Sequence, residues 1–148
     1  MTANATEGDA APRARRRQRL RLERVAHQGA PDGNCLISVI LESRGRLIQG
    51  EARALDTHHG RVRASAEAAL AAALSAGEGR VQLELIGVKA FRAFDGWVVV
   101  VRVVARAGEQ GFRLLGASSS EDEAGVERAS AQAVLDATNR VLERYALA

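Results

Sequence analysis

The sequence has one cysteine, few aromatic residues and no long apolar run. The single thiol, Cys35, excludes an intrachain disulfide and a multi-cysteine metal site, which favours a reducing compartment. No segment approaches the roughly 18–20 apolar residues of a membrane-spanning helix, and the N-terminal segment lacks the hydrophobic stretch of a signal peptide. We therefore expect a cytoplasmic protein without a membrane segment. Because aromatic residues make up only 3% of the chain, its core must consist of Val, Leu, Ile and Ala.

Lysine is also nearly absent, and the basic charge is concentrated near the N-terminus. Residues 1–24 carry seven arginines and three acidic residues, a net charge of +4, whereas the rest of the chain carries 14 basic and 15 acidic residues, a net charge of −1. A nearly neutral body weighs against electrostatic binding of nucleic acid by the folded part. The 148 residues, 47% hydrophobic and 26% charged, suit one globular domain.

The first 18 residues lack apolar periodicity, which predicts a disordered, arginine-rich leader before a single domain at 19–148. Two interpretations of the leader stay open. It is either a tail that binds nucleic acid weakly or a solubilising segment before the first strand. The residues of the possible nucleic-acid tail are Arg13, Arg15, Arg16 and Arg17.

One stretch of the sequence occurs twice. The run 64–72 returns at 129–137, where six of its nine positions are identical. The flanks agree as well, because Gly50 and Gly116 each end a short apolar run at a similar distance before the repeated stretch. Similarity at a fixed offset, with matching flanks, indicates a duplicated structural unit.

Apolar periodicity and turn residues place three strands and one helix in each unit. The sequence therefore predicts an α+β fold made of two tandem β-β-β-α units, 19–77 and 80–147, with an antiparallel sheet and two helices packed on one face. The expected strands cover about residues 19–28, 35–43, 46–54, 80–91, 97–107 and 112–118, and the expected helices about 61–76 and 120–145. Ser120 and Glu123 have the spacing of a capping box at the start of the second helix.

Both faces of the predicted strand at 97–107 are apolar. A sheet that is covered by helices on one side only should instead alternate apolar and polar residues. We therefore expect another copy of the chain to cover the second face, which makes the protein a homodimer. The predicted interface residues are Val98, Val100 and Val104. In the alternative interpretation, the first strand or the leader folds back over this face.

Three groups of polar residues suggest chemistry, and each has a simpler structural explanation. The adjacent histidines His58 and His59 lack the i,i+4 spacing of a helical metal site, so a solvated loop is favoured. Ser65 and Ser130 are in no nucleophile motif and suit packing or a hydrogen bond to a helix carbonyl. The acidic run 121–123 suits the first turn of a helix. We predict no catalytic residue, no metal site and no cofactor, and hence no enzyme.

The turn at 116–120 is the best candidate for a ligand site. It ends a strand directly before a predicted helix, whose free N–H groups and dipole favour an anion. The predicted ligand is a small carboxylate or an amino-acid-like metabolite, and the predicted binding residues are Gly116, Ser118, Ser119 and Ser120. In the alternative interpretation these serines only cap the helix.

This stretch resembles the C-terminal regulatory domain of α-isopropylmalate synthase, an allosteric and dimerisation domain with two units of three strands and a helix. The residues that carry the resemblance are Gly116, Ser118, Ala129, Ser130, Ala133, Ala137 and Asn139. The synthase's catalytic barrel has no counterpart here, and the family's Gly-x-Gly reads Gly-Ala-Ser. The pattern also looks like small actinobacterial proteins of unknown function.

Together these features predict a non-catalytic module that senses a small metabolite or mediates regulatory dimerisation, as the resemblance implies. The alternatives are a structural or partner-binding module, and weak nucleic-acid binding through the leader. A double-stranded RNA-binding domain also has three strands and an alanine-rich helix. It requires a lysine cluster at the start of that helix, where this chain has Ser-Ser-Ser-Glu-Asp-Glu.

Overall fold

Residues with a left-handed backbone end the strands at the expected turns. Gly33 and Gly45 have φ angles of 86° and 79°, and Gly108 has a φ of 62°. At the hairpin after the fourth strand, Phe94 and Asp95 both have positive φ angles, 55° and 60°. Two successive left-handed residues form the tight turn whose twist matches that of paired antiparallel strands. Glycine adopts such a backbone easily, whereas Phe94 has a conformation that is uncommon for a bulky residue.

The computed structural model describes residues 19–147, so the predictions for the leader lie outside the described residues. The elements are β1 (Arg21–Gly29), β2 (Asn34–Ser43), β3 (Arg46–Leu55), α2 (His58–Ala76), β4 (Gln82–Ala93), β5 (Gly96–Ala107), β6 (Gln110–Ser120), the short 3-10 helix η1 (Glu123–Gly125) and α3 (Val126–Tyr145). This order confirms the predicted α+β class and the repeated β-β-β-α arrangement.

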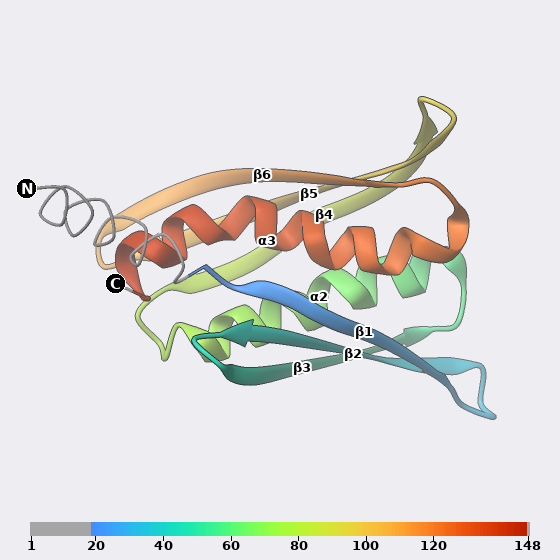
Figure 1. Ribbon diagram of the computed structural model, residues 1–148, viewed down its shortest axis with the longest axis horizontal. Coiled ribbons are helices and arrows are strands. Elements are labelled where there is room, and N and C mark those ends of the chain that lie inside the picture. The colour runs from blue at the N-terminus through green and yellow to red at the C-terminus, as the bar shows by residue number, and fades with distance from the viewer. Residues whose placement is uncertain (1–18, 148) are drawn as a thin grey trace, which may run out of the picture.

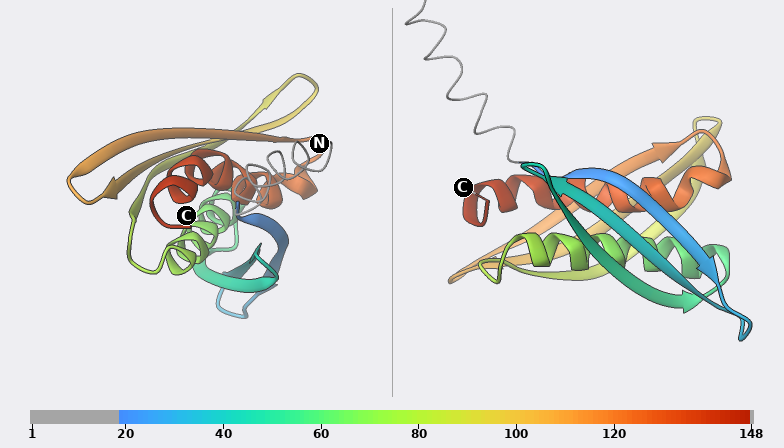
Figure 2. Two further views of the ribbon diagram at one scale, coloured as in Figure 1. Left: turned by 60° about the vertical axis from the view of Figure 1, so that its left-hand side comes forward. Right: turned by 60° about the horizontal axis from the view of Figure 1, so that its bottom comes forward.

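The six strands form two separate antiparallel sheets, β1-β2-β3 and β4-β5-β6. The two helices lie side by side between these sheets, which gives three layers (Figures 1 and 2). Helix α2 packs on β2 and β3 of its own unit and also contacts β4, whereas α3 packs on β5 and β6 and also contacts β1. The first strand of each unit therefore lies against the helix of the other unit. Neither helix between residues 19 and 147 is long and apolar enough to cross a membrane.

Small residues allow the helices to fit between two sheets. In α2, Ala64, Ala68 and Ala72 are completely buried. The helix backbones come close to the strands at two glycines, Gly50 and Gly116. A Cβ atom built on Gly50 would lie 2.1 Å from the carbonyl oxygen of Ala68, and one built on Gly116 would lie 2.1 Å from the carbonyl oxygen of Ala133. The repeated alanines and glycines of the sequence thus form the same contact twice.

Buried polar residues join the elements. The Ser130 hydroxyl donates to the carbonyl oxygen of Val62, 2.7 Å away on the neighbouring helix, and the Ser65 hydroxyl donates to a carbonyl of its own helix at 2.8 Å. The structural interpretation of both serines is confirmed. Asn139 of α3 donates to the carbonyl oxygen of Leu20 and accepts from its N–H, at 3.2 and 3.1 Å. This pair of bonds fixes the backbone just before β1.

The second helix begins later than predicted. Strand β6 continues to Ser120, and α3 starts at Val126 after η1. The predicted capping box of Ser120 and Glu123 was wrong, because Asp122 provides the cap and accepts from the N–H of Gly125 at 3.0 Å. Near its end β6 keeps the alternation of a strand, with Ser118 and Ser120 facing inwards and Ser119 facing outwards, so the strand extends into the expected helix start.

Candidate functional site

The prediction of a turn at 116–120 was wrong, because these residues form the end of β6 and pair with β5. Gly116 is buried against α3, and the Ser120 hydroxyl donates to the carbonyl oxygen of Asp122 at 2.7 Å. Ser118 is half-buried and Ser119 is exposed. The start of α3 lies beyond η1, so its free N–H groups do not directly follow these serines. Ligand binding by Gly116, Ser118, Ser119 and Ser120 stays a prediction.

The predicted dimer residues lie together on the outer face of the second sheet. Val98, Val100 and Val104 are half-buried there, whereas the alternate valines of β5 point towards the helices and are buried. The same outer face carries Leu115 and Phe91, which are 62% and 38% exposed. A shallow depression of about 420 Å³ lies on this surface, and Lys89 and Arg102 are among the residues that line it.

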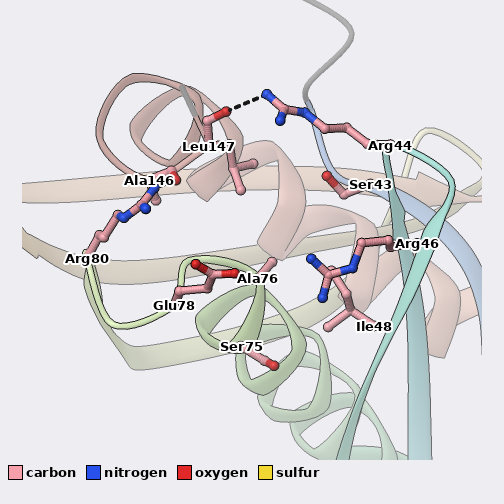
Figure 3. Close-up of a pocket in the computed structure, with 10 residues that line it drawn as sticks. All are labelled: Ser43, Arg44, Arg46, Ile48, Ser75, Ala76, Glu78, Arg80, Ala146 and Leu147. Atoms are coloured by element: carbon pink, nitrogen blue, oxygen red, sulfur yellow. Dashed lines mark hydrogen bonds between the residues drawn. The ribbon is translucent and has the colours of Figure 1, made fainter.

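A more polar cavity lies at the C-terminal end of the two helices (Figure 3). We call it the arginine cavity. It has a volume of about 350 Å³ and combines the β2–β3 turn, the end of α2 with the loop that follows, and the end of α3. Its lining residues are Ser43, Arg44, Arg46, Ile48, Ser75, Ala76, Glu78, Arg80, Ala146 and Leu147.

Two of its arginines are held by the end of α3. Arg44 donates to the carbonyl oxygen of Leu147 at 3.2 Å, and Arg80 donates to that of Ala146 at 2.9 Å. Carbonyl groups at a helix C-terminus have no helical partner and carry partial negative charge, so they attract cations. These contacts fix both guanidinium groups at the cavity wall.

Arg46 and Glu78 face the interior of the cavity from opposite sides (Figure 3). Among the residues that the structure describes, neither takes part in an ion pair or a side-chain hydrogen bond. With three arginines and one glutamate, the lining has a net charge of +2. Ile48, Ala76 and Leu147 add apolar surface. Such a lining suits a small anion that carries an apolar or amino group.

Sequence reasoning missed this cavity because its residues are far apart in the chain. Arg44 and Arg46 flank the glycine of a hairpin, which is an ordinary turn sequence. Glu78 has a left-handed backbone with φ of 52°, and it turns the chain from α2 towards β4. The only available signal was the number of arginines next to predicted turns.

A second polar cluster lies at the opposite end of the helices. The Asp56 carboxylate is 2.9 Å from Nε2 of His27 and accepts from Nη1 of Arg61 at 3.0 Å, and Arg61 also pairs with Glu127 of α3 at 3.0 Å. The bonds to His27 and then to Arg61 hold the pKa of Asp56 below its ordinary value. The hydrogen bond to Asp56 raises the pKa of Arg61. The cluster thus links β1, α2 and α3.

The remaining candidate residues of the sequence do not converge on one site. The predicted solvated loop at His58 and His59 was wrong, because both residues belong to the first turn of α2. His58 lies 3.3 Å from the Glu123 carboxylate and packs against the Trp97 ring, while His59 is exposed. Cys35 is buried beside Asp56, and its burial, followed by the charge of Asp56, raises the pKa of the thiol. Such a thiol is a poor nucleophile.

No protein-family model matches the chain, and no curated protein matches it significantly.

Proposed function

We propose that the protein is a non-catalytic regulatory module that binds a small carboxylate or an amino-acid-like metabolite in the arginine cavity. The observation that carries this proposal is the guanidinium of Arg46, which pairs with no side chain among residues 19–147 and faces a cavity of about 350 Å³ across from the carboxylate of Glu78. The ligand's carboxylate binds Arg46, with Arg44 and Arg80 beside it. Its amino group, when present, binds Glu78.

The residues that line the cavity favour binding over catalysis. Arginine is permanently charged and forms paired hydrogen bonds with carboxylates, but it is a poor general acid or base at neutral pH. Glu78 has no histidine, lysine or thiol beside it in the cavity lining. The resemblance to the regulatory domain of α-isopropylmalate synthase supports a sensing function, since that family uses two such units for allosteric control.

Binding should be visible as thermal stabilisation of the protein. A ligand at one hundred times its Kd adds about 2.7 kcal/mol to the free energy of unfolding. We therefore expect one or more amino acids or small carboxylates, tested at millimolar concentration, to raise Tm by several degrees. In the Arg46→Ala variant, affinity should fall about tenfold or more, because a charge-assisted hydrogen bond is lost.

Two further variants make this test specific. Arg53→Ala removes an exposed arginine from the same strand, outside the cavity, and should bind like the wild type. Glu78→Gln should weaken binding of amino acids while leaving binding of simple carboxylates unchanged. Flat melting curves with every metabolite, or equal losses in Arg46→Ala and Arg53→Ala, would favour the alternative of a purely structural or partner-binding module.

We also propose that two copies of the chain pair through the outer face of β4-β5-β6. The support is the β-branched surface of Val98, Val100 and Val104, extended by Phe91 and Leu115. A two-fold axis brings one patch against its twin, and burial contributes about 25 cal/mol per Å² of apolar surface. The proposed module would then combine ligand binding with dimerisation.

Light scattering at micromolar concentration should give twice the 15.8 kDa of one chain. Val100→Glu should convert this dimer to a monomer, because the new carboxylate would be desolvated in the interface. Ile40→Glu places the same kind of change on the outer face of the other sheet and should remain dimeric. Since Lys89 and Arg102 also face outwards, added salt should strengthen the dimer. A monodisperse 15.8 kDa particle would refute it.

A further inference from the structure

Three side chains with different metal-binding groups converge at the end of the helices opposite the arginine cavity. They are His27 of β1, Cys35 of β2 and Asp56 of the loop between β3 and α2. One nitrogen, one sulfur and one carboxylate oxygen, taken from these three residues, all lie within 4.8 Å of one another. The sequence predicted no metal site, because His58 and His59 lack the spacing of a helical metal site and a single cysteine excludes a multi-cysteine site.

The register of the first sheet explains this convergence. His27 pairs with Ile37, and Gly29 pairs with Cys35, so His27 and Cys35 project from the same face of the sheet on neighbouring strands. Leu55 pairs with Asn34, and this places Asp56 just beyond the start of β2. The three donors therefore come from backbone segments that hydrogen bonds hold in place.

We propose that His27, Cys35 and Asp56 bind a divalent transition-metal ion of the zinc type, with a fourth position open to water. Zinc accepts this mixture of imidazole, thiolate and carboxylate ligands. With bonds of about 2.0–2.3 Å, tetrahedral ligands lie roughly 3.5 Å apart. Donors that lie within 4.8 Å of one another need to approach by about 1.3 Å at most, and the thiol gives up its proton when the ion binds.

The neighbours of the cluster suit such an ion. Arg61 donates to the Asp56 carboxylate at 3.0 Å and can orient it, while its own charge is balanced by Glu127 at 3.0 Å. One thiolate and one carboxylate then neutralise the two charges of the ion. The ion takes the place of the hydrogen bond between His27 and Asp56, and the neutral imidazole then carries its proton on the ring nitrogen that does not bind the ion.

The cluster is buried at Cys35 and reaches solvent at His27. Cys35 is 1% exposed and closes the inner side of the cluster. The His27 side chain is 40% exposed and borders a cavity of about 280 Å³, whose other lining residues include Arg61 and Glu127. This geometry provides an entry path and a solvent-facing coordination position, as a three-ligand zinc site requires.

Cobalt is a suitable probe, because a thiolate bound to Co²⁺ gives a charge-transfer absorption band. Cys35 is the only cysteine of the chain, so any such band reports on this site. Titration of the full-length protein with Co²⁺ should produce the band at one equivalent of metal, and Zn²⁺ should abolish it. Cys35→Ser should remove the band, and His27→Gln or Asp56→Asn should weaken cobalt binding at least tenfold.

His59→Gln is the matched control, since it removes an exposed histidine of the neighbouring helix end and should leave cobalt binding unchanged. Circular dichroism of each metal-free variant checks that it is folded. If Cys35→Ser does not fold, the comparison of His27→Gln with His59→Gln decides the question. Cobalt binding without a thiolate band, or equal cobalt affinity in these two histidine variants, would overturn the proposal.

Discussion

Replacing Gly116 by alanine should destabilise the protein by about 3 kcal/mol or more and lower its Tm by roughly 10 °C. The new Cβ atom would lie 2.1 Å from the carbonyl oxygen of Ala133 and 2.6 Å from the backbone nitrogen of Ala137. Both contacts are with helix backbone, so no side chain can rotate to relieve them. Helix α3 would have to move away from β6, which would also disturb its contacts with β1 and α2. Chemical denaturation and thermal melting both measure this loss.

Gly111→Ala is the matched control in the same strand. A Cβ atom at Gly111 meets nothing within 4 Å, so this variant should stay within about 0.5 kcal/mol of the wild type. Gly50→Ala should repeat the large effect in the first unit, because its Cβ would lie 2.1 Å from the Ala68 carbonyl oxygen. Similar stabilities for Gly116→Ala and Gly111→Ala would show that strand and helix are not in close contact.

Replacing Asn139 by alanine should cost about 2–4 kcal/mol. The Asn139 side chain is the partner of both the N–H and the carbonyl group of Leu20, at 3.1 and 3.2 Å. Leu20 is 2% exposed, so water cannot readily replace these bonds in the native structure. The variant leaves two buried backbone groups without partners and releases the chain just before β1. Urea denaturation gives the loss of stability.

Gln132→Ala removes another long amide-bearing residue from the same helix, on its exposed side, and should be nearly neutral. Proteolysis provides a second readout, because a released start of β1 should be cleaved faster in Asn139→Ala than in Gln132→Ala. Equal stability and equal cleavage rates in these two variants would contradict the anchoring function of Asn139.

The repeat and its elements could be predicted from the sequence because their causes are local. The β2–β3 turn at Gly45 results from a short-range backbone preference, and α2 ends at Ala76 as predicted. A run that is apolar on both faces located β5, and the matching alanines located both helices. Even the correspondence of Gly50 with Gly116 was visible, although their contact with a helix backbone was not.

The division into two sheets depends on contacts between distant parts of the chain, and the sequence indicates it only indirectly. One signal was available: α2 has alanines on all its sides, as expected for a helix that is covered from several directions. The arginine cavity and the cluster around Asp56 each combine residues from three separate segments. Their side chains become neighbours only after β1 is placed beside β2 and α3 is placed beside α2, so the sequence alone could not reveal them.

The position of both helices between the sheets has a consequence for unfolding. Strand β1 lies against α3, and β4 lies against α2, so each repeat provides part of the cover for the helix of the other. Loss of one repeat exposes apolar surface on both helices, and neither repeat retains a closed core by itself. Although the chain contains a duplication, its described part therefore behaves as one cooperative unit with a single unfolding transition.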